Sequence, residues 1–116
     1  MTKRVTIIVK TDPSREKSRV TEALRIAAAM IGMDLIPRIL FCCGGVRCLL
    51  RGKERGREDY WGYLKAVADL AGLYLLSSKE EKEPWLSDLE GSLSLRLISP
   101  KEAAEMISES DIVFAL

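Results

Sequence analysis

The sequence predicts an α/β fold of three layers, α/β/α, built around a mostly parallel five-stranded sheet. Short runs of β-branched residues or leucine alternate along the chain with segments in which apolar residues recur at helical spacing. This alternation is typical of a mostly parallel sheet that helices cover on both faces. The length of 116 residues fits one domain, residues 1–116.

The first strand is expected at residues 4–10, RVTIIVK, a run rich in β-branched apolar residues. The following TDPS offers Asp12 as a helix cap and Pro13 as the first helical residue. Gly32 closes this helix. Its apolar positions lie at helical spacing: Val20, Leu24, Ala27, Ala28 and Ile31.

A second strand is expected at residues 34–41, DLIPRILF, although Pro37 either weakens this assignment or moves the strand toward an edge. A second amphipathic helix then ends at Gly72, with an apolar face of Tyr60, Leu64, Val67 and Ala71. The elements expected after it are a strand at 73–78, a charged connection at 79–91 with one helical turn near 85–90, a strand at 93–99, a helix from Pro100 and a terminal strand at 111–116.

Composition excludes several classes of function. A net charge of +1 gives no reason to expect nucleic acid or an anionic membrane as partner. No apolar run approaches the roughly 20 residues that span a bilayer, and the N-terminus is too polar for a signal peptide, so we expect a cytoplasmic protein with reduced cysteines. The chain has no histidine, which excludes Cys–His and Ser–His–Asp catalysis.

The candidate chemistry lies in FCCGGVRC, which holds all three cysteines. Cys42 and Cys43 are expected at the end of the second strand, where neighbouring side chains point to opposite faces, so at most one faces the crevice. Cys48 is expected in the first turn of a short helix, VRCLL. Nearby cations favour a thiolate, and glycines let backbone N–H groups approach an anion. The residues concerned are Arg47, Arg51, Gly44 and Gly45.

In open α/β sheets, ligands bind beyond the carboxyl ends of the strands. Three loops are expected there: Thr11–Ser14, Cys42–Arg57 and Ser77–Glu83. The cysteines lie in one of them. The residues alone favour small buried side chains over chemistry, since free cysteine is often buried.

Other uses of these thiols are disfavoured by geometry or spacing. A vicinal disulfide is strained, and zinc would lack a fourth ligand at any usual spacing, so we expect no metal. GGVRCLLRG is neither a Walker loop nor a dinucleotide motif, and no organic cofactor is expected. Tyr60, Trp61 and Tyr63 favour core or subunit packing over base stacking.

The order of these segments resembles the DsrE/DsrF-like family of sulfur-relay proteins, which includes the TusBCD subunits. The matching segments span essentially the whole chain: VTIIVKTDP, FCCGGV with a following LL, the helix that begins DYW, Gly72 with LYLLSS, and SDIVFAL. The resemblance implies an α/β protein that assembles as a trimer or hexamer, or with related DsrE-like subunits. It also implies sulfur donor and acceptor partners, because some members carry a persulfide on a cysteine.

The sequence departs from this family at the usual sulfur-carrying position. That cysteine lies six positions after the glycine that ends the preceding helix, and counting from Gly72 gives Ser78, which cannot hold a persulfide. We therefore expect a sulfurtransferase-like carrier that uses Cys43, with Cys48 second and Cys42 third. Arg47 and Arg51 would hold the thiolate or a thiosulfonate-like substrate.

Two alternatives stay open. In the first, the protein is a non-catalytic DsrF-like structural subunit. Its apolar contact surface would then include Trp61, Tyr63, Leu49 and Leu50. In the second, it is a small anion-binding or nucleotide-binding module, with the ligand over Gly44 and Gly45.

Overall fold

The computed structural model describes residues 3–49, 57–77 and 94–116. Its five strands form one sheet in the order β4-β3-β2-β1-β5, and every pairing is parallel. The predicted three-layer α/β fold is therefore confirmed. The strands are β1 Val5–Val9, β2 Arg38–Phe41, β3 Leu73–Leu76, β4 Leu95–Ile98 and β5 Ile112–Ala115; the helices are α1 Lys17–Gly32, the 3₁₀ helix η1 Cys43–Leu49, α2 Arg57–Leu70 and α3 Pro100–Ser108.

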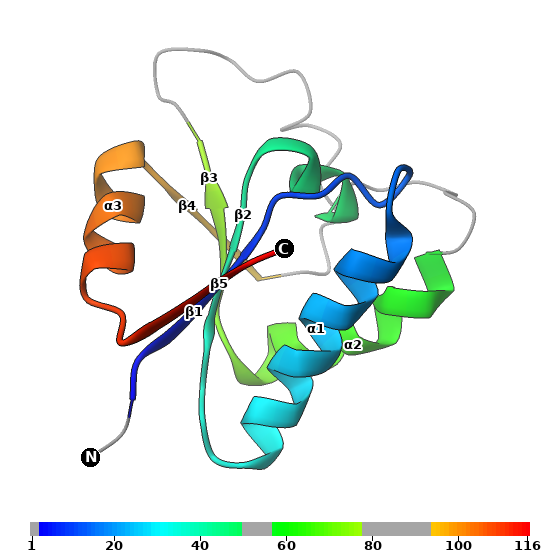
Figure 1. Ribbon diagram of the computed structural model, residues 1–116, viewed down its shortest axis with the longest axis horizontal. Coiled ribbons are helices and arrows are strands. Elements are labelled where there is room, and N and C mark those ends of the chain that lie inside the picture. Colours follow the sequence, from blue (N-terminus) through cyan, green and yellow to red (C-terminus); the bar gives the residue numbers. More distant parts are fainter. Residues whose placement is uncertain (1–2, 50–56, 78–93) are drawn as a thin grey trace.

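Helices cover both faces of the sheet, with α1 and α2 together on one face and α3 on the other (Figure 1). Alternate residues of a strand point to opposite faces, so β1, β2, β3 and β4 each contribute to both cores. The larger core joins the sheet to α1, η1 and α2, and its fully buried members include Ile7, Val9, Leu24, Ile39, Phe41, Leu49, Leu64 and Leu75. The smaller core, under α3, contains Leu40, Ile98, Ala103 and Met106.

The predicted helical face of α2 and the predicted start of α3 are confirmed. The four apolar positions expected on α2 are all buried: Tyr60, Leu64, Val67 and Ala71. α3 begins at Pro100, as expected, and Ser99 caps it. The Ser99 side chain accepts a hydrogen bond from the N–H of Glu102, whose carboxylate accepts one from the N–H of Ser99.

The predicted start of the first helix is wrong. α1 begins at Lys17, four positions after Pro13, and Glu16 precedes it without a side-chain cap. The Asp12 side chain instead accepts hydrogen bonds from the N–H and hydroxyl of Ser14. Local bonding of this kind competes with helix formation, so Asp12 holds the loop and the helix starts after it.

The predicted extent and place of the second strand also need correction. β2 begins at Arg38, directly after Pro37, and it pairs with β1 on one side and β3 on the other. Pro37 lies outside the ladder, so its missing N–H does not push β2 to an edge. The predicted charged connection at 79–91 lies outside the described residues. Within the described ranges, no helix has the length and apolarity needed to cross a membrane.

Candidate functional site

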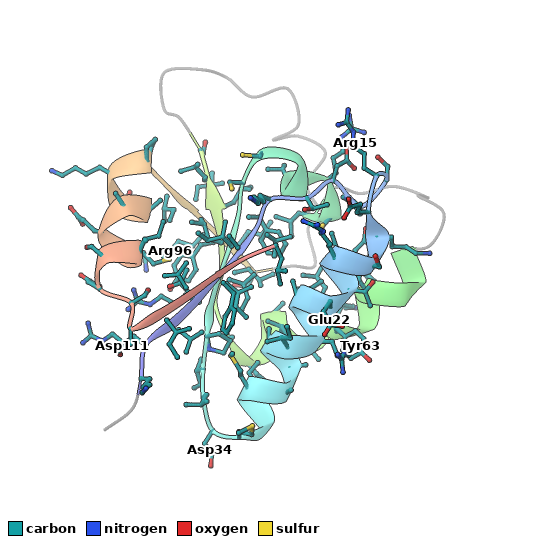
Figure 2. The ribbon with its side chains drawn as sticks, viewed as in Figure 1. Arg15, Glu22, Asp34, Tyr63, Arg96 and Asp111 are labelled. Atoms are coloured by element: carbon teal, nitrogen blue, oxygen red, sulfur yellow. The ribbon has the colours of Figure 1, made fainter. Side chains whose placement is uncertain are left out.

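Two of the three expected loops meet at the carboxyl ends of β1 and β2. An open hollow of about 430 Å³ lies there, lined by Lys10, Thr11, Asp12, Arg15, Glu16, Arg19 and Gly44. Figures 1 and 2 show η1 and the loop with Arg15 at this end of the sheet, opposite the turn that carries Asp34. Of the third loop, only Ser77 is described, and its N–H donates to the carbonyl of Ile98.

The cysteine loop is fixed against the end of β1 by backbone contacts. The N–H of Cys42 donates to the carbonyl of Val9 over 3.1 Å, and the N–H of Gly45 donates to the carbonyl of Cys42 over 3.0 Å. A Cβ on Gly45 would lie 2.0 Å from the Val9 oxygen, so only glycine allows this approach. The Gly45 N–H is thus used within the protein, whereas Gly44 lines the hollow.

The three thiols lie in different environments. Cys43 is exposed, Cys42 is half-buried and Cys48 is fully buried in the larger core. β2 ends at Phe41, so neither vicinal cysteine belongs to the strand. Cys43 begins η1 with a positive φ of 54°. The Cys43 thiol is therefore exposed because of this local backbone turn, and not because of strand alternation. Cys48 lies near the end of η1, not in the first turn of a helix.

Burial raises the pKa of the Cys42 thiol from its ordinary value of 9.0 to about 11. A hydrogen bond to the Cys43 side chain and the charge of Cys43 also raise this pKa, while the nearby Lys10 ammonium lowers it. The unfolded chain loses the Cys42 proton near pH 9, and the folded protein keeps it up to about pH 11. This thiol therefore leaves stability unchanged below pH 9 and lowers it as the pH rises from 9 to 11.

We expect iodoacetamide to distinguish the three thiols. At pH 8 Cys43 should be alkylated first, since it is exposed, and Cys42 should react only as the pH approaches 11. Cys48 should stay unmodified until the protein is denatured. Fragmentation mass spectrometry of alkylated samples checks the order, with fully denatured protein as the control. Equal rates at Cys42 and Cys43 at pH 8 would contradict it.

Asp12 joins the two loops by an ion pair. Its Oδ2 lies 3.3 Å from Nε of Arg47, and its side chain is only 17% exposed. Burial alone would raise the pKa of Asp12, but hydrogen bonds from Ser14 and the charges of Arg47 and Arg15 bring it below the ordinary value. Asp12 is therefore a carboxylate at neutral pH, and it ties η1 to the loop that precedes α1.

The structure brings most of the predicted site residues together. Cys42, Cys43, Gly44, Gly45 and Arg47 lie in one loop beside the hollow. Arg51 and Ser78 lie outside the described residues, as does Leu50. The expectation that Leu49 offers apolar surface is wrong, because its side chain is fully buried in the core.

Two polar residues of the site carry no sequence pattern that assigns them to it. Lys10 ends the first apolar run and lies close enough to Cys42 to affect its pKa, and Asp12 is the partner of Arg47. Both lie in the loop that follows β1. A parallel pairing of β1 with β2 is the signal that would have placed them beside the cysteines.

These features define the class of protein: a three-layer α/β/α fold with a parallel sheet and a thiol-bearing loop at its carboxyl edge. The solved structure of the YchN protein from E. coli, a protein of the DsrE/DsrF-like fold, is similar to this chain. The TM-score is 0.70 at 18% sequence identity, and the match covers 98% of this chain and 99% of YchN. No protein-family model and no curated protein matches the sequence. At this identity the likeness shows the fold.

Proposed function

We propose that the protein is a small cytoplasmic sulfur carrier of the DsrE/DsrF-like type, which holds sulfane sulfur as a persulfide on Cys43. The observation that carries the proposal is the exposed thiol of Cys43 at the carboxyl edge of the parallel sheet, where α/β proteins bind their ligands. The fold that the chain shares with YchN agrees with the family resemblance of its sequence.

The chemistry needs a thiolate and no cofactor. The Cys43 thiolate attacks the sulfane sulfur of a thiosulfonate, a new S–S bond forms, and the old one breaks as sulfinate leaves with the electron pair. A thiolate of an acceptor protein then attacks the outer sulfur and restores Cys43. Cys48 takes no part in this scheme, because it is fully buried.

Positive charge around the hollow suits an anionic donor. Lys10 and Arg15 are exposed and line the hollow. Their charged groups can therefore contact a bound thiosulfonate without a rearrangement of the core. Arg47 is 57% exposed and makes its ion pair through Nε, and its guanidinium carries further donors for an anion. We propose Arg51 as a further cation of the same site.

The protein would work as a homo-oligomer, a trimer or a hexamer, or with related DsrE-like subunits. Several large apolar side chains in the described residues are exposed, and contact with other subunits would bury them: Met33, Ile36, Leu70 and Leu97. Light scattering on the purified protein measures the assembly. A monomer at micromolar concentration would count against this part of the proposal.

The test of sulfur carriage is intact-protein mass spectrometry of the reduced protein after incubation with thiosulfate or a low-molecular-weight persulfide. We expect a gain of one sulfur atom that reductant removes and that fragmentation assigns to Cys43. A protein that gains no sulfur until it is denatured would contradict the proposal and favour a structural subunit.

A further inference from the structure

Cys42 and Cys43 are neighbours along the chain, and both reach the surface to different extents. Cys43 is exposed and Cys42 is half-buried, and Cys43 lies close enough to Cys42 to raise its pKa, so the pair opens to solvent on the Cys43 side. Sulfur transfer to one exposed thiol needs only Cys43. The second thiol is therefore a feature that the proposed function does not use.

The backbone favours a bridge between these sulfurs over a direct bond. The described residues contain no cis peptide bond, and neighbouring Cα atoms across a trans peptide lie about 3.8 Å apart. Disulfides usually need at least about 4.4 Å between Cα atoms, so a direct S–S bond would be strained. A direct disulfide would close a small ring through the two side chains and the peptide bond between them. An atom bound to both sulfurs adds one member to that ring, and the two sulfurs can then stay at non-bonded contact distance.

We propose that Cys42 and Cys43 form a bidentate site for thiophilic trivalent arsenic, and that its preferred ligand is a monosubstituted arsenical. Thiolates are soft ligands and select soft centres of this kind. The site is independent of the proposed sulfur carriage, because it needs both thiols.

The number of thiols sets the preference among arsenicals. Cys48 is the third cysteine of the chain, and it is fully buried in the core on the α1 and α2 side. Among the residues that the structure describes, no three His, Cys, Asp or Glu side chains gather as a metal site. Arsenite has three exchangeable hydroxyl groups, and this pair of thiols can replace only two of them.

A monosubstituted arsenical matches the pair. R–As(OH)₂ exchanges both As–O bonds for As–S bonds to Cys42 and Cys43, the two thiol protons leave with the hydroxyl groups as two waters, and arsenic stays trivalent. The nearby Lys10 ammonium favours loss of the Cys42 proton, which burial opposes. Arsenite would keep one hydroxyl group, so we expect it to bind more weakly.

The loop holds the two sulfurs in place before the ligand arrives. The N–H of Cys42 is bonded to Val9, and Gly44 and Gly45 pack closely against Asp12 and Val9. Little backbone freedom is lost on binding, which favours affinity.

The experiment is a titration of the reduced protein with phenylarsine oxide, followed by native mass spectrometry. We expect one arsenical per chain, released by a dithiol such as dimercaptopropanol but not by an equal concentration of a monothiol. Cys42→Ser and Cys43→Ser should each weaken binding by on the order of 100-fold, because one thiol then replaces a chelating pair. Cys48→Ala is the matched control and should keep the parent affinity.

Several outcomes would overturn the proposal: no binding by the parent, parent-like binding by Cys42→Ser, or loss of binding in a folded Cys48→Ala variant. Circular dichroism checks the fold of each variant. Alkylation of the parent as the pH approaches 11, where free Cys42 also reacts, gives a readout without mutation, because bound phenylarsine oxide should protect both Cys42 and Cys43. Protection of Cys43 alone would also refute a bidentate site. A Cys42→Ser variant that still accepts sulfur but loses the arsenical would separate this site from the sulfur carrier.

Discussion

Replacing Gly45 with alanine should destabilise the protein by about 3 kcal/mol or more. The added Cβ would lie 2.0 Å from the carbonyl oxygen of Val9 and 2.7 Å from its carbonyl carbon. Both atoms belong to the backbone of β1, which is paired on both sides by β2 and β5. The Val9 oxygen also accepts the N–H of Cys42. Relief of the clash therefore requires either a shift of a central strand or loss of the bond that anchors the cysteine loop.

Urea unfolding measures this effect, and the chain offers two matched glycine controls. Gly62 lies in α2 with nothing within 4 Å of an added Cβ, so Gly62→Ala should raise stability by up to about 1 kcal/mol. Gly44→Ala should fall between the two, since its Cβ would meet Asp12 at 2.9 Å. A Gly45→Ala protein within 1 kcal/mol of the parent would show that the loop does not pack on β1 in this way.

The layers of the fold could be predicted because each element carries its own periodic signal. The run RVTIIVK can bury both faces only inside a sheet, and Tyr60, Leu64 and Val67 share one face only on a helix. The start of α3, expected at Pro100, is equally local, since Ser99, Pro100 and Glu102 lie within four consecutive positions of the chain. Information of this kind does not depend on the order of the strands.

The start of α1 could not be predicted because two local structures compete for the same residues. Asp12 followed by Pro13 is a good helix start, but Asp12 bonds Ser14 instead and forms a turn. The ion pair with Arg47 further stabilises Asp12 in that loop. This partner lies far along the sequence and is brought close only by the pairing of β1 with β2.

The burial and exposure of the three cysteines could not be predicted from the sequence for a similar reason. Strand alternation does not apply at Cys43, because the strand has ended and its φ is positive. Cys48 is buried because η1 folds onto the larger core, and the residues GGVRC give no periodic signal for this. The sequence narrowed the site to one loop, and only the fold distinguishes its thiols.

Cys43→Ser should reduce sulfur loading from thiosulfate by roughly 100-fold or more, because a hydroxyl group is a poor nucleophile without a base to activate it. Cys42 should not replace the lost thiol at neutral pH. The charge of Cys43 disappears in this variant, but burial is the largest cause of the raised pKa of Cys42, and burial remains. We therefore expect the Cys43→Ser variant to show a small residual sulfur loading through Cys42, which increases as the pH rises.

The matched variants decide whether Cys43 acts as the carrier or as one thiol among three. Cys42→Ser should retain most of the loading, since the exposed Cys43 is unchanged, and Cys48→Ala should match the parent because Cys48 is buried in the folded protein. Intact-protein mass spectrometry at pH 7.5 to 8 measures all three variants under the same conditions. If Cys43→Ser loads sulfur as well as the parent, the persulfide is not on Cys43. If both Cys43→Ser and a Cys48→Ser variant do so, the mechanism of sulfur carriage on this loop is wrong.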